Sequence, residues 1–135
     1  MHRIAAVMSF ATIAIWAASV PAAKADTKVF PVFFQPWSAA ISKTASQTIA
    51  AAARAALADP STPVIVTGAA DTVGSSLANR YMSETRAQVV SDALAADGVV
   101  ASRIEVKAIG ATSAPDARPG SYAQFSRRTL IQVSD

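Results

Sequence analysis

The chain has 135 residues, of which 52% are hydrophobic and 16% charged, and it contains one histidine, His2, and no cysteine. This length accommodates one small domain and excludes two. Because cysteine is absent and the histidine is at the very start, the domain cannot use thiol chemistry, Cys/His zinc sites, iron–sulfur clusters or histidine-activated nucleophiles. We therefore expect a protein that is not an enzyme and that has no cofactor and no metal site.

The first 25 residues have the pattern of a secretory signal peptide. Met1–Arg3 is a short cationic start, Ile4–Val20 is almost uncharged, and an Ala-Lys-Ala sequence before Asp26 fits the cleavage site. A membrane anchor is the alternative, but this apolar stretch is at the short limit for a span. We expect cleavage after Ala25 and export of residues 26–135 to the periplasm, in the neighbourhood of the outer membrane or cell wall, with no transmembrane segment remaining.

The expected mature chain is nearly neutral. Arg3 and Lys24 leave with the signal peptide, so 10 of the 12 Lys and Arg remain against 9 Asp and Glu. A net charge of about +1 does not indicate a nucleic acid or an acidic membrane as the partner. Without cysteine in an oxidising compartment, the fold depends on packing alone. The sequence does not indicate an oligomeric state.

The first predicted elements are a strand and a helix. Residues 28–34 are apolar and β-branched or aromatic, which predicts a strand, best developed from Val32, and Pro31 argues against a central position in a sheet. Helical spacing of apolar residues then predicts a helix over 39–59, with Ser38 as its N-cap. The proline that follows Asp59 ends this helix.

The remaining elements are one helix and three strands. Residues 63–68 form a continuous apolar run typical of a strand buried on both faces. A helix over 77–97 ends before Gly98, which suits the left-handed residue after a helix. Alternation predicts strands at 103–109 and 129–133, separated by a loop over 110–121. On the second helix, the predicted apolar side comprises Leu77, Tyr81, Val90 and Leu94. The order and the short connections predict an α/β fold, a two-layer sandwich of helices on one sheet.

The loop Thr67–Gly74 follows a strand and invites comparison with the glycine-rich phosphate turn of short-chain dehydrogenases. Such a turn needs a central glycine, and Thr72 stands in that place. A mature chain of about 110 residues is also too short for a dinucleotide domain with its substrate half. We therefore do not expect a dinucleotide.

The same loop fits a different family when it is taken with its neighbours. In this order and at this spacing, five fragments resemble the OmpA-like C-terminal domain, whose pattern is approximately G-H-T-D-x-x-G, N-x-x-L-S-x-x-R-A, G-V and N-R-R. The resemblance covers residues 28–134. The fragments are Gly68-x-x-Asp71-x-x-Gly74, Asn79-x-x-Met82-Ser83-x-x-Arg86-Ala87, Gly98-Val99, Gly110 and Ser126-Arg127-Arg128.

This resemblance implies a βαβαββ fold with two helices packed on a mixed four-stranded sheet. It also implies non-catalytic, non-covalent binding of peptidoglycan through the diaminopimelate residue of its stem peptide. Diaminopimelate presents an ammonium and a carboxylate at one end. Asp71 can accept the ammonium protons and Arg86 can bind the carboxylate with its fork of donors. These two residues match the ligand-binding positions of the family.

Helix spacing agrees with this assignment and leaves one alternative open. Asn79 and Arg86 lie at i and i+7, so they share a face that can turn toward the loop of Asp71. Asn79 is therefore a third candidate, bonding either the loop or the ligand. The alternative is that Asp71 and Arg86 merely pair with each other and fix the loop to the helix.

The sequence departs from the family pattern around this same site. Ala69 and Ala70 replace a histidine and a threonine, Ser126 replaces an asparagine, and Trp37 stands where asparagine or aspartate is common. A hydrogen bond lost to a charged ligand group costs about 1.5–3 kcal/mol, or one to two decades of affinity. Trp37, Ala70 and Ser126 are the candidate walls of the pocket. Trp37 either stacks on the ligand or packs on the first helix.

These departures support a second functional hypothesis. The domain would be a degenerate OmpA-like scaffold or protein-interaction module of the cell envelope that has lost peptidoglycan binding. For Arg127 and Arg128, alternation along a strand predicts that one pairs with an acid near the sheet while the other meets solvent.

Overall fold

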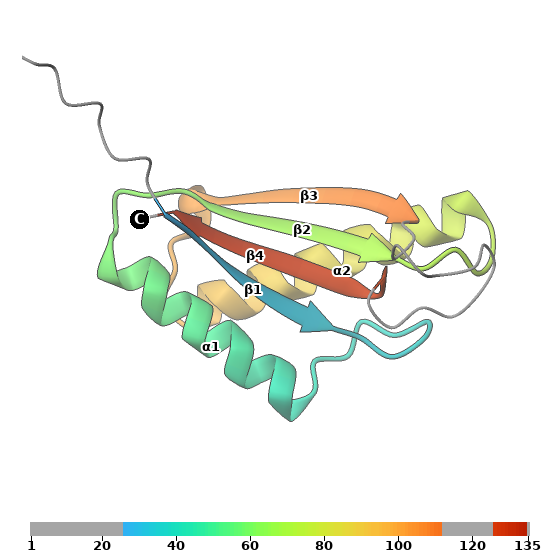
Figure 1. Ribbon diagram of the computed structural model, residues 1–135, viewed down its shortest axis with the longest axis horizontal. Coiled ribbons are helices and arrows are strands. Elements are labelled where there is room, and N and C mark those ends of the chain that lie inside the picture. Colours follow the sequence, from blue (N-terminus) through green and yellow to red (C-terminus); the bar gives the residue numbers. More distant parts are fainter. Residues whose placement is uncertain (1–25, 112–125, 135) are drawn as a thin grey trace, which may run out of the picture.

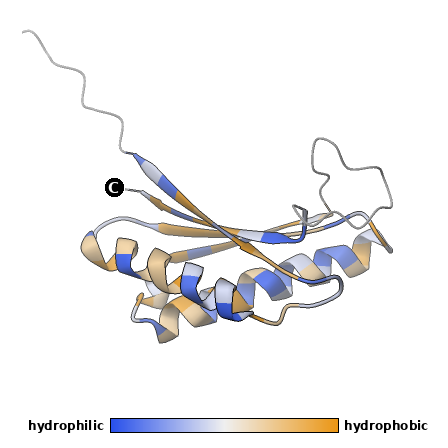
Figure 2. Ribbon diagram, turned by 60° about the horizontal axis from the view of Figure 1, so that its bottom comes forward, coloured by the Kyte–Doolittle hydropathy of each residue, from blue (hydrophilic) through white to orange (hydrophobic). Residues whose placement is uncertain are grey.

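The computed structural model describes residues 26–111 and 126–134, so the expected signal peptide and most of the expected loop over 110–121 lie outside the described residues. Two helices pack on one face of a four-stranded sheet (Figure 1), which confirms the predicted two-layer α/β fold. Figure 2 shows the opposite face of the sheet with no helix over it. The elements are β1 (Thr27–Phe33), α1 (Lys43–Ala58), β2 (Val64–Ala70), α2 (Ser76–Ala96), the 3₁₀ turn η1 (Ala101–Arg103), β3 (Ile104–Ala111) and β4 (Arg128–Ser134).

The sheet is mixed, with the strand order β1-β4-β2-β3. β2 and β3 are parallel and are joined through α2, while β4 is antiparallel to both β1 and β2. Pro31 lies in β1 at the edge of the sheet, as its missing N–H predicts. The prediction that β2 is buried on both faces is wrong for one of them. Ile65 and Thr67 point to the side of the sheet without helices and are only half-buried.

Helix α1 begins at Lys43, four residues later than predicted. Its N-cap is Ser42, whose hydroxyl accepts a hydrogen bond from the backbone N–H three residues on. Ser38 forms a local turn instead, and its carbonyl accepts a hydrogen bond from Arg86 Nε. A helix capped at Ser38 would use this carbonyl for its own first hydrogen bond. Because Arg86 already occupies the carbonyl of Ser38, the helix begins at the next suitable N-cap, Ser42.

The other end of α1 is capped by a distant arginine. Arg103, from η1, donates to the carbonyls of Ala56, Asp59 and Thr62 at distances of 2.8–3.0 Å. These groups lie at or just beyond the last turn of α1, where carbonyls have no partner within the helix. A cation is also favoured there by the helix dipole. Arg103 thus joins the end of α1 to the start of β3.

Helix α2 ends as predicted, with Gly98 at a φ of 106°, but its predicted apolar side is wrong in the first half. Leu77 and Tyr81 are 59% and 60% exposed, while Val90 and Leu94 are fully buried. Nine residues at about 100° each place Tyr81 on the opposite side from Val90. The buried side of the first half is polar, because it faces the candidate site and not the hydrocarbon core. It comprises Asn79, Ser83 and Arg86.

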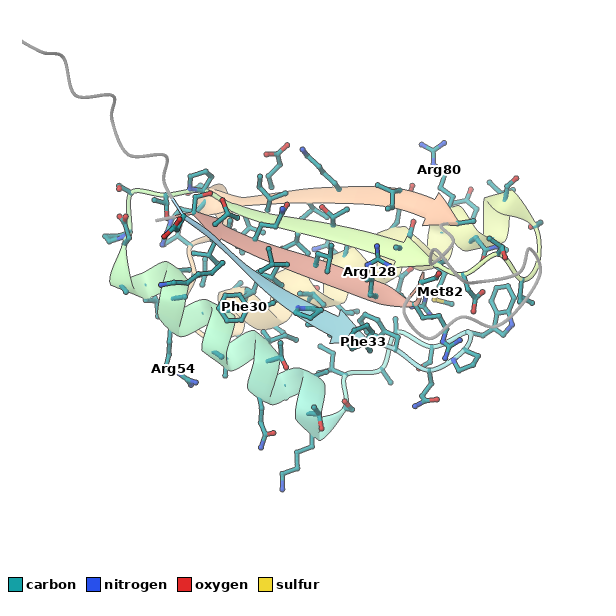
Figure 3. The ribbon with its side chains drawn as sticks, viewed as in Figure 1. Phe30, Phe33, Arg54, Arg80, Met82 and Arg128 are labelled. Carbon is teal, nitrogen blue, oxygen red and sulfur yellow. The ribbon has the colours of Figure 1, made fainter. Side chains whose placement is uncertain are left out.

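The core lies between the helices and the sheet. Phe30 points from β1 toward α1 (Figure 3) and packs against this core. Gly68 of β2 lies directly under α2, since a Cβ there would overlap the carbonyl oxygen of Ser83. The close approach of α2 to β2 brings the candidate site residues of both elements together. Across residues 26–111 and 126–134, no helix has the length and apolar character needed to cross a membrane. The buried alanines of α1 are Ala45, Ala52, Ala53 and Ala56.

Candidate functional site

Two of the predicted site residues, Asp71 and Arg86, lie close to the end of β2, together with Arg127, which was not predicted as a site residue. Asp71 directly follows β2, Arg86 lies in α2, and Arg127 directly precedes β4. All three side chains belong to residues that are more than nine-tenths buried. Titratable groups in such positions mark candidate functional sites.

Arg86 is 1% exposed and donates hydrogen bonds to three backbone carbonyls. Its Nε reaches Ser38 at 2.9 Å, its Nη1 reaches Ala69 at 3.1 Å, and its Nη2 reaches Gln35 at 3.1 Å. The guanidinium also lies over the ring of Phe34, 5.2 Å from its centroid. Arg86 therefore connects α2 to the end of β2 and to the segment between β1 and α1.

The pKa of Arg86 is lowered to about 10, mainly by burial, while the charge of Asp71 raises it and the charge of Arg127 lowers it. The guanidinium is still charged at neutral pH. Removing it from water disfavours the charged form, and a second anion beside it would favour that form. The lowered pKa therefore reflects the removal of the guanidinium from water, which the attraction of Asp71 only partly offsets.

Asp71 pairs with Arg127 and not with Arg86. Its Oδ2 lies 3.3 Å from Arg127 Nη1, and its Oδ1 accepts from the N–H of Val73 at 3.3 Å. Arg127 Nε in turn donates to the carbonyl of Phe34 at 3.0 Å. The expectation that one of the two adjacent arginines pairs with an acid is confirmed for Arg127. The alternative of a simple pair between Asp71 and Arg86 is wrong.

Arg128 lies on the other face of the sheet. It is the register partner of Phe33, and the two side chains lie next to each other in Figure 3. Alternation along the strand separates Arg128 from Arg127. Arg128 is therefore not part of the group around Asp71.

In the segments 26–111 and 126–134, the site has more positive than negative charge. Two buried guanidinium groups, Arg86 and Arg127, accompany one carboxylate, Asp71, among these residues. Within the part of the chain that the structure describes, no carboxylate lies within ion-pair distance of Arg86. Uncompensated buried charge is costly, so such a site favours the entry of an anion.

Asn79 fixes the loop that carries Asp71. Its Nδ2 donates to the carbonyl of Val73 at 2.9 Å, and the residue is 2% exposed. The same loop enters α2 through Ser75, the N-cap, whose hydroxyl accepts from the N–H of Ala78. Of the two roles predicted for Asn79, the structure shows the contact with the loop.

Trp37 connects the two loops of the site. The backbone of Gln35–Ser38 forms a turn closed by a 3.2 Å hydrogen bond, and Trp37 within it has a φ of 51°. Positive φ is uncommon for a bulky residue and marks a strained position. The indole lies against Gly74, where a Cβ would come within 2.5 Å of the ring. Trp37 is 46% exposed, whereas Ala70 and Ser126 are fully buried.

The backbone partners of Arg86 and Arg127 could not be identified from the sequence, because a carbonyl acceptor leaves no signal in residue identity. Two signals in the sequence pointed to Arg127, its place in a motif that matches the family and the strand alternation that predicted an acid partner for one of the two adjacent arginines. Among residues 26–111 and 126–134, no three His, Cys, Asp or Glu side chains are grouped in a way that could bind a metal ion.

Solved structures with the same fold are found in several bacteria. The OmpA-like domain of FopA1 from Francisella tularensis subsp. tularensis SCHU S4 has a TM-score of 0.74 at 22% identity, with 83% of this chain and 75% of that chain covered. The peptidoglycan-associated lipoprotein from Burkholderia pseudomallei has a TM-score of 0.66 at 23% identity, with 78% of this chain and 89% of that chain covered. The periplasmic domain of Helicobacter pylori MotB has a TM-score of 0.64 at 22% identity, with 83% of this chain and 77% of that chain covered.

At these identities the structural likeness establishes the fold, and a family model establishes the relationship. No protein of curated function matches the chain in sequence. The model of the OmpA family matches residues 33–128, which is more than half of the chain and includes Asp71, Asn79 and Arg86. The chain belongs to the OmpA family.

Proposed function

We propose that this protein binds peptidoglycan non-covalently and without catalysis, through the diaminopimelate residue of the stem peptide. The observation that carries the proposal is the buried excess of positive charge among the described residues, where Arg86 and Arg127 lie beside one carboxylate, that of Asp71. An amino acid end with one carboxylate and one ammonium complements this arrangement. The similarity in fold to a peptidoglycan-associated lipoprotein agrees with this ligand class.

Arg86 provides the donors for the ligand carboxylate. A guanidinium has five N–H groups, and three of them are used by backbone carbonyls. One N–H remains on each Nη nitrogen, which is the number needed for a bidentate carboxylate. Binding of an anion there also offsets the desolvation that lowers the pKa of Arg86.

Asp71 provides the acceptor for the ligand ammonium. Each of its two oxygens accepts one long bond of 3.3 Å, one from Arg127 and one from the N–H of Val73. A carboxylate has about four lone-pair sites, so two acceptor positions remain. Because Asn79 fixes the loop of Asp71, this acceptor is in place before the ligand arrives.

The proposed location follows from the ligand. We propose that residues 1–25 direct export and are removed after Ala25, so that residues 26–135 act in the periplasm close to the cell wall. The similar periplasmic domain of MotB agrees with an envelope location. The mass of the protein purified from the envelope tests the cleavage site, since processing elsewhere or retention of the first 25 residues would contradict it.

Cosedimentation with purified peptidoglycan sacculi tests the binding. We expect the protein to sediment with sacculi and the Asp71→Asn and Arg86→Lys variants to remain largely in the supernatant. The matched control is Arg54→Ala, which removes an exposed arginine of α1 that points away from the sheet (Figure 3). Equal sedimentation of folded wild type and site variants would contradict the proposal.

One observation favours the second candidate function, a scaffold that has lost peptidoglycan binding. The three carbonyl contacts of Arg86 give this residue a structural role without any ligand. In addition, Ala69 and Ala70 contribute no polar side chain to the site. A protein that ignores sacculi but retains another envelope partner in both site variants would support this candidate.

A further inference from the structure

A cavity of about 420 Å³ lies between the end of β1 and the start of α1. Its volume is at the lower end of the range of about 300–1,000 Å³ that is usual for small-ligand sites. This is room for one or two amino acid residues and not for a protein domain. Figure 3 shows Phe33, one of the lining residues, at the end of β1. The lining residues are Pro31, Val32, Phe33, Phe34, Gln35, Ser42, Thr44, Ala45, Thr48 and Arg127.

This cavity shares part of its wall with the proposed diaminopimelate site. Phe34 accepts a hydrogen bond from Arg127 through its carbonyl and lies under Arg86 with its ring. Gln35 accepts from Arg86 Nη2. Arg127 lines the cavity and also pairs with Asp71. A peptide bound at Asp71 and Arg86 therefore has the cavity directly beside it.

The cavity is suited to an anion. Among the described residues, its lining contains an arginine and three hydroxyl groups and no acidic residue. Arg127 uses its Nε and Nη1, while its Nη2 makes no hydrogen bond to any residue in 26–111 or 126–134. Ser42 accepts from a backbone N–H through its oxygen, so its own proton can still be donated. Together these groups offer donors for a carboxylate.

We propose that this cavity is a second subsite, which binds a carboxylate on a residue next to diaminopimelate in the same peptide. The inference rests on the proposed function, because the diaminopimelate site places the peptide. Its physical basis is the shared wall and the complementary charge of Arg127. Two sites joined by one ligand increase the affinity without further ordering of the protein.

Calorimetry on the full chain tests the subsite with two ligands, free diaminopimelate and a muropeptide in which diaminopimelate has neighbouring residues with free carboxylates. We expect the muropeptide to bind at least tenfold more tightly than the free amino acid. Amidation of the carboxylates outside diaminopimelate should remove this difference. If amidation leaves the affinity unchanged, the subsite is refuted while diaminopimelate binding stands.

Variants of α1 provide the second test. Thr44→Asp places a negative charge at an exposed lining position, and the uncharged Thr44→Asn is its control. Thr48→Tyr fills the cavity, and its control is Thr85→Tyr on α2, because both threonines donate to the carbonyl four residues earlier. We expect the affinity of Thr44→Asp and Thr48→Tyr for the muropeptide to fall tenfold or more. Their affinity for free diaminopimelate should equal that of the wild type.

Three results would overturn the inference. If folded Thr44→Asp and Thr48→Tyr bind the muropeptide as tightly as their controls, the cavity does not contact the ligand. If backbone amide resonances of Ser42–Thr48 do not move when the muropeptide is added, the same conclusion follows. If neither diaminopimelate nor the muropeptide binds the wild type at millimolar concentration, the proposed function fails and the subsite fails with it.

Discussion

The Arg86→Ala substitution tests how strongly this one side chain connects the parts of the site. The arginine donates to the carbonyls of Gln35, Ser38 and Ala69, which belong to two segments separated in the sequence. Alanine removes all three donors together with the contact to the ring of Phe34. The hydrophobic core between the helices and the sheet does not include Arg86, so the variant should still fold, although the start of α1 is no longer fixed by the bond to the carbonyl of Ser38.

The magnitude follows from the three carbonyls. A buried carbonyl that loses its donor costs about 1–3 kcal/mol, which sets an upper limit of about 9 kcal/mol for three of them. Water in the vacated space recovers part of this. The variant also no longer buries the charge whose desolvation lowers the pKa of Arg86 to about 10. We therefore expect a net loss of about 3–5 kcal/mol in the free energy of unfolding, about half of the upper limit.

Thermal unfolding followed by circular dichroism measures this loss. In a domain of this size 1 kcal/mol corresponds to about 4–8 °C, so the midpoint of Arg86→Ala should fall by at least about 12 °C. The control Arg54→Ala should stay within about 0.5 kcal/mol of the wild type, because that side chain is exposed. A loss below about 1 kcal/mol for Arg86→Ala would refute the structural role of the three contacts.

Three further substitutions test single features. Gly74→Ala should lower the free energy of unfolding by about 1–2 kcal/mol, because Gly74 has a φ of 89°. The new methyl group should also displace the ring of Trp37 and shift its fluorescence, so an unchanged spectrum would contradict this contact. Thr129→Val should raise the free energy of unfolding by about 1 kcal/mol, because the buried hydroxyl has no hydrogen-bond partner within residues 26–111 and 126–134; a lower free energy of unfolding in a urea titration would show a hidden partner. The pKa of Asp59 should lie below its ordinary value, mainly because the hydroxyl of Ser61 donates a hydrogen bond to its carboxylate. The contribution of Asp59 to stability is therefore present above the pKa of the unfolded chain and is lost as the pH falls through the pKa of the folded protein. In Ser61→Ala, carboxyl chemical shifts should report a higher pKa for Asp59.

The order and type of the elements could be predicted from the sequence because each has a clear local pattern. Pro31 indicated an edge strand, and Gly98 indicated the end of α2. Their consequences are local, since a missing N–H or a positive φ acts at the residue itself. The fold class and the family relationship followed from such patterns taken in order.

The start of α1 and the polar side of α2 could not be predicted in the same way. Ser38 and Ser42 are equally good N-caps, and Arg86, far along the chain, decides between them by taking the carbonyl of Ser38. Leu77 and Tyr81 have the composition of core residues, but their half of α2 turns a polar face inward. Both errors arise where the candidate site competes with local preference, as expected for a functional site.

The interaction partners of Asp71 and Arg86 could not be predicted from the sequence either. Asp71 and Arg86 were correctly placed near each other, yet the ion pair is formed with Arg127. The choice depends on the position of β4, whose start brings Arg127 beside the loop after β2. This long-range packing leaves Arg86 with backbone carbonyls as its only described acceptors, and the proposed anion site follows from it.

The central claim is that the buried arginine excess binds the carboxylate of diaminopimelate. The most direct test is a calorimetric titration of the protein with a diaminopimelate muropeptide and with its lysine counterpart, which lacks the second carboxylate. The account predicts binding of the first ligand only, and its loss in Arg86→Lys, which keeps the charge without the fork of donors. Equal affinity for both muropeptides, or no heat with either at millimolar concentration, would contradict it.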